Sequence, residues 1–480
     1  MTANPDFDFK SLLLASCAAE VNEELDLFSP SPLSSATSSP LTSVPTSCAS
    51  SPVPPSTANT NHAAAFHSLP SKPPPTPPPF PATSSSKATN TRNKNKRNKA
   101  RGHANRKRKC EQEQEGTYGI HATRPSVRKK FVIPSQPLKT NLETDGIPIA
   151  STGFIGRRDK KTKRLHTLED LTGPNSPYGF RLVSWSGSGP AVSIVDGEGR
   201  VIAVLAGRPE DESWDDSQRE AAVLLQRGSR RCYISKAARK KARRGRFSAL
   251  ATGVSYGGGQ RMPMNLVNST KNTKIVNELM GHRSFQRFAG FASSTFSTWA
   301  PKLYAHYSDR MGSLFAHDPR LRRNFRSSVF TAATFNLGPR TVCFKHTDFA
   351  NLPFGWCAIT ALGDFDPKHG GHLILWECHL VIEFPPGSTV LIPSAVVAHF
   401  NTPVRKNETR YSFTQYTSGG LFRWVEHRMQ KEEHFYVGKS MEEILELDRE
   451  NAKRWEFGLS LFSTLDELKS IPNTNNASRL

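Results

Sequence analysis

The chain has 480 residues, a formal net charge of +22 and a hydrophobic share of 36 %. So basic a balance favours a polyanionic partner, nucleic acid or an acidic membrane surface. No stretch reaches the roughly 18 apolar residues that a membrane span needs, so we expect no membrane insertion. The seven cysteines are widely spaced and form no CxxC pair, which argues against a disulfide framework or a zinc knuckle and favours reduced thiols inside a cell.

Residues 1–150 are predicted to be a long disordered N-terminal region. Ser, Pro and Thr dominate residues 29–90, and such a composition cannot bury enough apolar surface to offset chain entropy. Its Pro runs are either a spacer or ligands for Pro-reading domains. Residues 87–109 contain no acidic residue, which indicates a nuclear-import signal or a nucleic-acid arm, with a solvated basic linker as the alternative. We therefore expect a nuclear protein.

Residues 178–326 are expected to form a mixed, partly helical section of a folded domain. Residues 191–205 predict a β-hairpin around the turn DGEG. Ser213 and Asp216 have the spacing of a capping box, so a helix is predicted from Ser213 through Leu225 and is expected to end at Gly228. A basic cluster at 238–246 follows and indicates a basic patch on the folded surface.

Two further helices are predicted in this section, over residues 274–280 and 302–315. An aromatic stripe lies between them and is typical of core packing, with base stacking as the alternative. Its members are Phe285, Phe288, Phe291, Phe296 and Trp299.

Residues 327–435 change to short strands separated by Gly and Pro turns. Eight strands within about 90 residues predict a mainly β fold with flanking helices, either a sandwich or a double-sheet jelly roll. The predicted strands are 328–337, 341–346, 356–362, 372–377, 380–384, 388–393, 396–401 and 410–416. Residues 436–480 are predicted to be a C-terminal helical extension that begins at a Ser440 cap.

Three residues of these strands suit a metal site. His346 and Asp348 are two apart, so on a strand both side chains would lie on the same face. His399 follows on another predicted strand. Two histidines and one carboxylate form the facial triad of non-haem Fe(II) oxygenases, which leaves positions for a 2-oxo acid and O2. The alternative is a set of polar residues in an inert barrel.

Arg410 and Ser412 strengthen this interpretation, because they complete a His-x10-Arg-x-Ser pattern that begins at His399. The far carboxylate of 2-oxoglutarate needs a fixed cationic partner, and arginine offers a permanently charged fork. If the barrel is inert, Arg410 would instead pair with a surface acid. His369, His372 and His379 lack a carboxylate at strand spacing and are interpreted as structural or substrate-facing.

Residues 346–404 and 410–425 resemble the fungal, often transposon-associated branch of the TET/JBP-like 2-oxoglutarate dioxygenases. The resemblance implies a double-stranded β-helix core, Fe(II) and 2-oxoglutarate as cofactor and cosubstrate, and oxidation of 5-methylcytosine in nucleic acid. On the matching positions, His346, Asp348 and His399 would be the metal ligands and Arg410 would bind 2-oxoglutarate. The first 150 residues carry no such resemblance.

A methylated base, most simply in DNA, is therefore the expected substrate. Because its methyl carbon lies inside the duplex, the base must be flipped out to reach a buried iron. Residues predicted to contact that base are Asn351, Phe354, Trp356 and His372, with core packing as the alternative for the two aromatics. Two rival functions stay open, namely oxygenation of RNA, a protein or a small molecule, and a non-catalytic nucleic-acid-binding module.

Overall fold

The computed structural model describes residues 101–102, 123, 125–158, 162–235, 242 and 244–470. The described residues from 123 onward belong to one unit, and Arg101 and Gly102 belong to another. The predicted Ser/Pro-rich region, nearly all of the basic run at 87–109 and most of the cluster at 238–246 lie outside the described residues. Within the described part, no helix combines the length and apolar character that crossing a membrane requires.

Two β-sheets organise the described residues from 123 onward. The large sheet has the strand order β1-β3-β4-β11-β8-β13-β7-β5-β6, and the small sheet has the order β12-β9-β10-β2. The strands are β1 Leu138–Lys139, β2 Arg181–Val183, β3 Val192–Val195, β4 Val201–Gly207, β5 Ser248–Ser255, β6 Met264–Asn265, β7 Ala332–Leu337, β8 Cys357–Asp364, β9 Leu373–Leu375, β10 Leu380–Ile382, β11 Thr389–Ile392, β12 His399–Asn401 and β13 Thr409–Tyr416.

The chain between β7 and β13 passes back and forth between the two sheets. β7, β8, β11 and β13 lie side by side in the large sheet, whereas β9, β10 and β12 belong to the small one. This winding is a double-stranded β-helix, so the predicted jelly-roll core is confirmed, as is a mainly β fold with flanking helices.

One of the eight predicted strands does not form. Residues 341–346 bond to three different neighbours instead of one ladder: Thr341 donates to the Arg410 carbonyl, Phe344 to the Arg244 carbonyl, and His346 to the His399 carbonyl. The segment therefore crosses from the large sheet to the small one.

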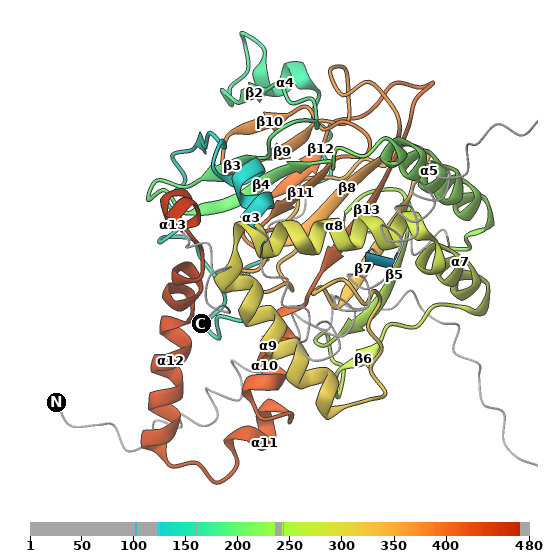
Figure 1. Cartoon of the computed structure of the whole chain (residues 1–480). Helices are drawn as coiled ribbons and strands as arrows, with labels where there is room; N and C mark the ends of the chain where they lie inside the picture. Colours follow the sequence, from blue (N-terminus) through green and yellow to red (C-terminus); the bar gives the residue numbers. More distant parts are fainter. Residues whose placement is uncertain are drawn as a thin grey trace, which may run out of the picture. The chain divides into compact units, whose positions relative to one another are not determined.

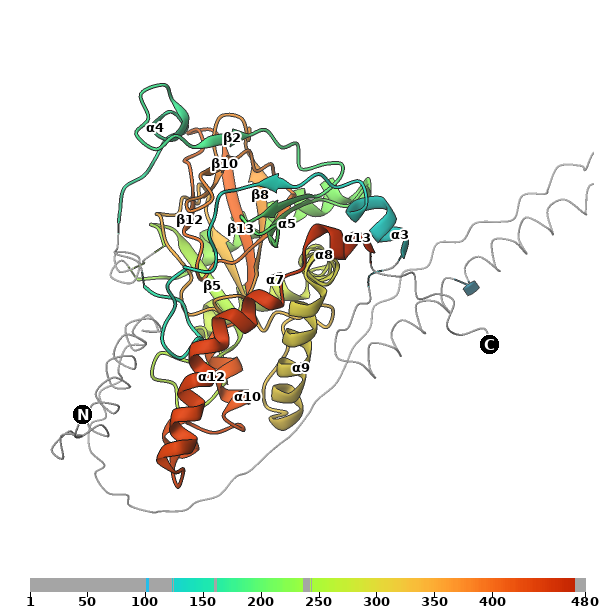
Figure 2. The ribbon, with the colours of Figure 1, turned by 90° about the vertical axis from the view of Figure 1, so that its left-hand side faces the viewer.

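Helices cover the face of the large sheet that is turned away from the small sheet. In Figures 1 and 2, α5 and α8 lie on one side of β8 and β13, and β12 lies on the other. The helices are α3 Pro125–Val127, the π-helix η1 Arg128–Val132, α4 Leu168–Thr172, α5 Ser213–Arg231, α7 Thr270–Gly281, α8 Arg283–Trp299, α9 Pro301–His317, α10 Gly419–Glu426, α11 Glu432–Tyr436, α12 Met441–Ser460 and α13 Leu465–Ser470.

Strand β13 shows how the sequence produces these layers. Its side chains alternate between faces, as in any strand. Tyr411 and Phe413 pack into the apolar cluster shared with α5, α7 and α8. Arg410, Ser412 and Thr414 face the opposite way and line a cavity between the sheets.

The predicted capping box of α5 is wrong in detail. Glu212 is the N-cap residue and makes no side-chain capping bond, because the Ser213 hydroxyl donates to Asp211 instead. Gly228 does not end the helix, which continues to Arg231. A Cβ at Gly228 would lie 3.0 Å from Ile275 Cγ2, so glycine allows α7 to approach closely.

Other local predictions are confirmed. The β3–β4 hairpin forms in antiparallel register, and Ser440 caps α12 in a reciprocal capping box with Glu443. In the aromatic stripe of α8, four members are buried and Phe291 packs against them while partly buried. Core packing is thus the role of this stripe.

The folded unit extends beyond the boundaries expected from composition. Residues 125–158 are described, and β1 pairs in parallel with β3. Near the C-terminus, Trp455 donates its indole N–H to the Thr144 carbonyl at 3.0 Å. The sections predicted as a disordered region and as a terminal extension therefore both contribute to this unit.

The partly buried imidazole of His306 makes stability depend on pH. Its ring lies parallel to Phe422 with centroids 5.3 Å apart. Burial, aided by Arg310 and Arg454, lowers the pKa of His306 to about 4. A histidine in the unfolded chain has a pKa of about 6.5. The stability that neutral His306 contributes above that pH is therefore lost as the pH falls toward 4.

We expect this histidine to contribute about 2 kcal/mol of the stability lost between pH 7.5 and 5. His306→Phe keeps an aromatic ring and should remove that share of the pH dependence, as measured by urea unfolding at both pH values. The same substitution at exposed His317 is the matched control. A His306→Phe variant with the full wild-type pH dependence would show that burial does not hold this imidazole neutral.

Candidate active site

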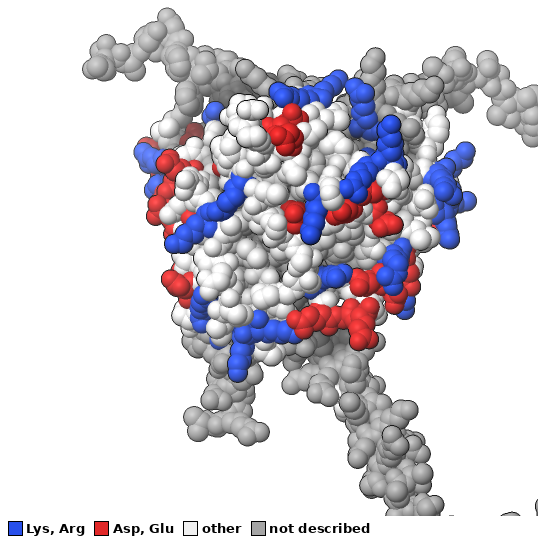
Figure 3. Space-filling model, turned by 90° about the horizontal axis from the view of Figure 1, so that it is seen from above, with Lys and Arg blue, Asp and Glu red and all other residues white. Residues whose placement is uncertain are grey.

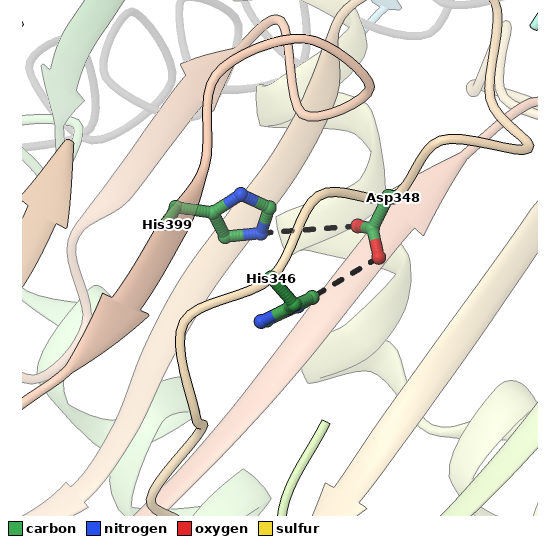
Figure 4. A group of neighbouring side chains, drawn as sticks. All are labelled: His346, Asp348 and His399. Carbon is green, nitrogen blue, oxygen red and sulfur yellow. Dashed lines mark ion pairs between the residues drawn. The ribbon is translucent and has the colours of Figure 1, made fainter. Parts of the chain in front are cut away.

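His346 and His399 face each other across the edge of the small sheet. His399 N–H donates to the His346 carbonyl at 2.9 Å, and His346 N–H donates to the His399 carbonyl at 3.3 Å. Residues directly opposite each other in an antiparallel pair point to the same face. The two imidazole centroids are accordingly 4.5 Å apart, and both rings point toward Asp348 (Figure 4).

Asp348 completes this group from the loop that follows His346. Its backbone N–H donates to the Ser394 carbonyl at 2.7 Å, which fixes the loop. Its carboxylate oxygens lie 3.7 Å from His346 Nε2 and 3.8 Å from His399 Nε2. One ligand atom from each residue lies within 4.8 Å of the others, so the three residues predicted as metal ligands form a candidate metal site.

The orientation of the imidazoles fits a metal. His346 Nδ1 lies 2.7 Å from the Phe344 carbonyl, and His399 Nδ1 lies 3.0 Å from the Val397 carbonyl. A carbonyl oxygen only accepts, so both Nδ1 atoms carry the proton. Each Nε2 then turns an unprotonated lone pair toward the centre, as metal-ligating histidines do. Two nitrogens and one carboxylate suit a divalent transition metal such as Fe(II).

Arg244 adds a cation to the metal group. Its Nη2 lies 2.9 Å from Asp348 Oδ1, and 35 % of its side chain is exposed. Desolvation disfavours the guanidinium charge, but the Asp348 carboxylate together with Tyr416, Cys343 and Cys357 more than offsets it, so the pKa of Arg244 is raised. The backbone holds this residue in place, because Phe344 N–H donates to the Arg244 carbonyl at 2.7 Å.

Arg410 and Ser412 lie in the same cavity as the metal group. Arg410 is 3 % exposed, and its Nη1 donates to the Thr341 carbonyl at 3.3 Å. Its Nε has no hydrogen-bond partner, and no carboxylate in the described part of the chain pairs with it. Burial lowers the pKa of Arg410 to about 10, which leaves the side chain charged at neutral pH.

This cavity therefore contains a buried cation with an unused donor. Ser412 lies beside Arg410 and accepts a hydrogen bond from Asn336 Nδ2 at 2.8 Å, so its hydroxyl proton remains available. Apolar side chains of Ile359, Leu373 and Phe384 line the remaining wall. An elongated dicarboxylate would satisfy Arg410 at one end and a metal at the other.

The residues predicted to contact a base do not line this cavity. Phe354 and Trp356 are each 1 % exposed and belong to the core cluster with α8 and α9, where Trp356 stacks on Phe296. Asn351 uses its amide to bond the Ser394 hydroxyl at 3.1 Å. The structure therefore gives these three residues packing and loop-positioning roles.

His372 is fully buried, and its Nδ1 lies 2.9 Å from the Thr402 hydroxyl. Burial lowers its pKa, so it stays neutral. His369 pairs with Asp366 at 2.6 Å on a turn, and His379 stacks on Phe180 outside the cavity. Of the two roles considered for these histidines, the structural one agrees with these contacts.

Two further residues of the site were not identified from the sequence. Arg244 belongs to the basic cluster assigned to the surface, whereas its guanidinium is directed at Asp348. Asn401 holds the crossing segment, since it accepts from Cys343 N–H at 3.0 Å and donates to the Thr341 carbonyl at 3.1 Å. A single sequence carries no signal for either contact, because both depend on how distant segments meet.

Comparisons with known proteins add only distant likenesses. No protein-family model matches the chain, and no curated protein sequence matches it. A solved structure described as NgTET1 in complex with 5mC DNA is 12 % identical, with 50 % of this chain and 83 % of that chain covered at a TM-score of 0.36. A 2OG-Fe(II) oxygenase family oxidoreductase from Burkholderia pseudomallei is 19 % identical, with 44 % and 92 % covered at a TM-score of 0.24. Likenesses at TM-scores this low carry no argument about the activity of this chain.

Arg244→Met tests the contact between Arg244 and Asp348. Removal of a group that orients a ligating carboxylate typically weakens metal binding about 10–100-fold, and we expect a loss of that size here. Fe(II) or Co(II) affinity, measured by anaerobic titration, is the readout.

Arg227→Met is the control, since it removes only an exposed pair with Glu278. Loss of the positive charge of Arg244 would by itself strengthen the binding of a metal cation. An unchanged or tighter metal affinity in Arg244→Met would therefore contradict the orienting role.

Proposed function

We propose that the chain is an Fe(II)- and 2-oxoglutarate-dependent dioxygenase that oxidises the methyl group of 5-methylcytosine in DNA. The observation that carries this proposal is one cavity that holds His346, Asp348 and His399 together with the buried cation of Arg410. In the overall reaction, one atom of O2 converts a methyl C–H into a hydroxymethyl group. The other enters 2-oxoglutarate, which leaves as succinate and CO2.

Each part of the cavity has a separate task in this proposal. His346, Asp348 and His399 would hold Fe(II), and Arg410 with Ser412 would hold the distal carboxylate of 2-oxoglutarate. When bound, Fe(II) would activate O2, the oxidant, and 2-oxoglutarate would supply two of the electrons that reduce it. The Nδ1 bonds would fix the two imidazoles and the Arg244 contact would fix Asp348, while the apolar wall would exclude water from the carboxylate of the cosubstrate.

The substrate is supported by charge and by the sequence resemblance. A net charge of +22 suits a polyanion, and residues 346–404 and 410–425 resemble dioxygenases that act on 5-methylcytosine. Because the metal group is buried, a duplex base must leave the stack to reach it, which costs a few kcal/mol. A nuclear location, directed by the basic run at 87–109, belongs to the same proposal.

Product analysis tests the substrate. Duplex and single-stranded DNA containing 5-methylcytosine should yield 5-hydroxymethylcytosine, and on further oxidation 5-formyl- and 5-carboxylcytosine, when supplied with Fe(II), ascorbate and 2-oxoglutarate. Mass spectrometry of the nucleosides is the measurement, and Asp348→Ala, which loses a proposed metal ligand, should give none of these products. Succinate formation without any oxidised base in DNA or RNA would refute the substrate while leaving the dioxygenase; no succinate at all would refute both.

Arg410→Met tests the cosubstrate site. Charge-assisted hydrogen bonds contribute about 1.5–3 kcal/mol, so the half-saturating 2-oxoglutarate concentration should rise about ten- to a hundred-fold. Arg405→Met is the matched control, because Arg405 is exposed and lies 3.8 Å from Glu408. An unchanged 2-oxoglutarate requirement in Arg410→Met would show that the carboxylate binds elsewhere.

A further inference from the structure

The segment from Gly156 to His166 starts against the metal-ligand loop. Gly156 N–H donates to the Phe349 carbonyl at 2.7 Å, and a Cβ at Gly156 would collide with the Ala395 carbonyl oxygen. The Arg158 guanidinium lies 5.7 Å from the Phe349 ring centroid. Phe349 directly follows Asp348, so this segment begins one residue from a proposed metal ligand.

The same segment ends against the neighbours of the two histidines. The buried ring of His166 lies 5.3 Å from that of Phe400 and 6.0 Å from that of Trp376. Phe400 follows His399, and Lys345, which precedes His346, holds its Nζ 3.8 Å from the Trp376 ring centroid. Both ends are therefore anchored beside the segments that carry the metal group.

Cations gather at this second anchor. Lys163 and Arg164 are exposed and Lys345 is partly exposed, and no carboxylate among the described residues forms an ion pair with any of the three. Asp170 is the nearby acid, and its carboxylate accepts the Thr167 backbone N–H in the capping box of α4. The Thr167 hydrogen bonds and, to a smaller extent, the Arg164 charge lower the pKa of Asp170, so this acid offsets part of the positive charge without forming an ion pair.

Aromatic rings accompany these cations. Trp376 and Tyr178 are partly exposed, their centroids lie 5.2 Å apart, and Arg164 Nη1 lies 3.5 Å from the Tyr178 hydroxyl. A surface that combines cations with accessible aromatic rings suits nucleic acid, which offers both phosphates and stacking bases. Within the chain, Trp376 and Tyr178 pack on each other and on Phe180, and Lys345 lies over the Trp376 ring, so a ligand would reach only their exposed parts. An acidic peptide would use the cations alone.

This face of the molecule carries charges of both signs. Figure 3 views the molecule from the side on which α4 and β2 lie in Figure 1, and both basic and acidic side chains are visible there. The overall positive charge of the chain therefore does not by itself define a binding site on this surface. A phosphate-binding site needs neighbouring cations that form no ion pair within the chain, and Lys163, Arg164 and Lys345 form none with the described carboxylates.

We propose that a phosphate-binding patch, formed by Lys163, Arg164 and Lys345 with Trp376 and Tyr178, holds the nucleic-acid strand next to the nucleotide that enters the active site. The identity of that nucleotide rests on the proposed function, whereas binding at the patch does not require catalysis. The patch shares no residue with the basic cluster at 238–246, one of whose described members, Arg244, contacts Asp348.

The test compares two variants of the full chain that lose the same charge. One carries Lys163→Gln, Arg164→Gln and Lys345→Gln, and the control carries Lys271→Gln, Lys274→Gln and Lys453→Gln, which lie on α7 and α12. Fluorescence anisotropy of a labelled DNA duplex over a series of salt concentrations, without iron, gives the salt dependence of binding. Each lost phosphate contact should flatten the slope of log K against log salt by about 0.9.

We expect the patch variant to flatten this slope by about 2–3 and the control to leave it unchanged. Equal slopes in the patch variant and the wild type, or equal flattening in both variants, would overturn the proposal. A second variant, Lys163→Gln with Arg164→Gln, leaves the residue beside His346 intact and should flatten the slope by about 1–2. A flattened slope in the patch variant, with no base oxidation by the wild-type protein, would support the patch and refute the proposed function. Base oxidation by the wild-type protein, with an unchanged slope in the patch variant, would support the proposed function and refute the patch.

Discussion

The site depends on the antiparallel pairing of His346 with His399. Two reciprocal backbone bonds, at 2.9 and 3.3 Å, place these residues directly opposite each other, and this register alone puts both imidazoles on one face. A slip by one residue would turn one ring to the outside of the sheet. The same segment carries Asp348 to the Ser394 carbonyl and bonds Thr341 to β13, so one crossing segment links the metal group to Arg410.

Local patterns in the sequence were sufficient to predict which side chains lie together where a regular strand forms and its side chains alternate between two faces. The alternation of β13 placed Arg410 and Ser412 together. His346 and Asp348 do meet, but Asp348 reaches the group from a loop and not from the strand that the spacing implied. Local patterns failed where the hydrogen-bond partners of the backbone change from one residue of a segment to the next. Residues 341–346 alternate like a strand, yet they bond to three separate neighbours, which no local periodicity can express. Ser213 likewise has the spacing of a cap, but a nearer acceptor, Asp211, takes its hydroxyl.

Residue type alone did not identify the contacts made by side chains from distant segments. For Phe354 and Trp356, which follow the proposed metal-ligand loop, both base contact and core packing were considered; they are buried in the core cluster with α8, α9 and α12. Arg244 is the converse case, because a residue in a basic run contacts Asp348. In both cases the long-range fold decides which side chain meets the cavity. The cavity that results combines a candidate metal group, a buried cation and an apolar wall, and neutral His372 is held outside it.

The central claim is that the metal group and Arg410 bind one and the same molecule. Anaerobic calorimetry of 2-oxoglutarate binding, with and without Mn(II) as a redox-stable substitute for Fe(II), tests it directly. If one dicarboxylate contacts both, removal of the metal should weaken binding at least about tenfold, which corresponds to about 1.4 kcal/mol. In the Arg410→Met variant, the metal-loaded protein should show a comparable loss. Equal affinity with and without the metal in the wild-type protein would contradict the account.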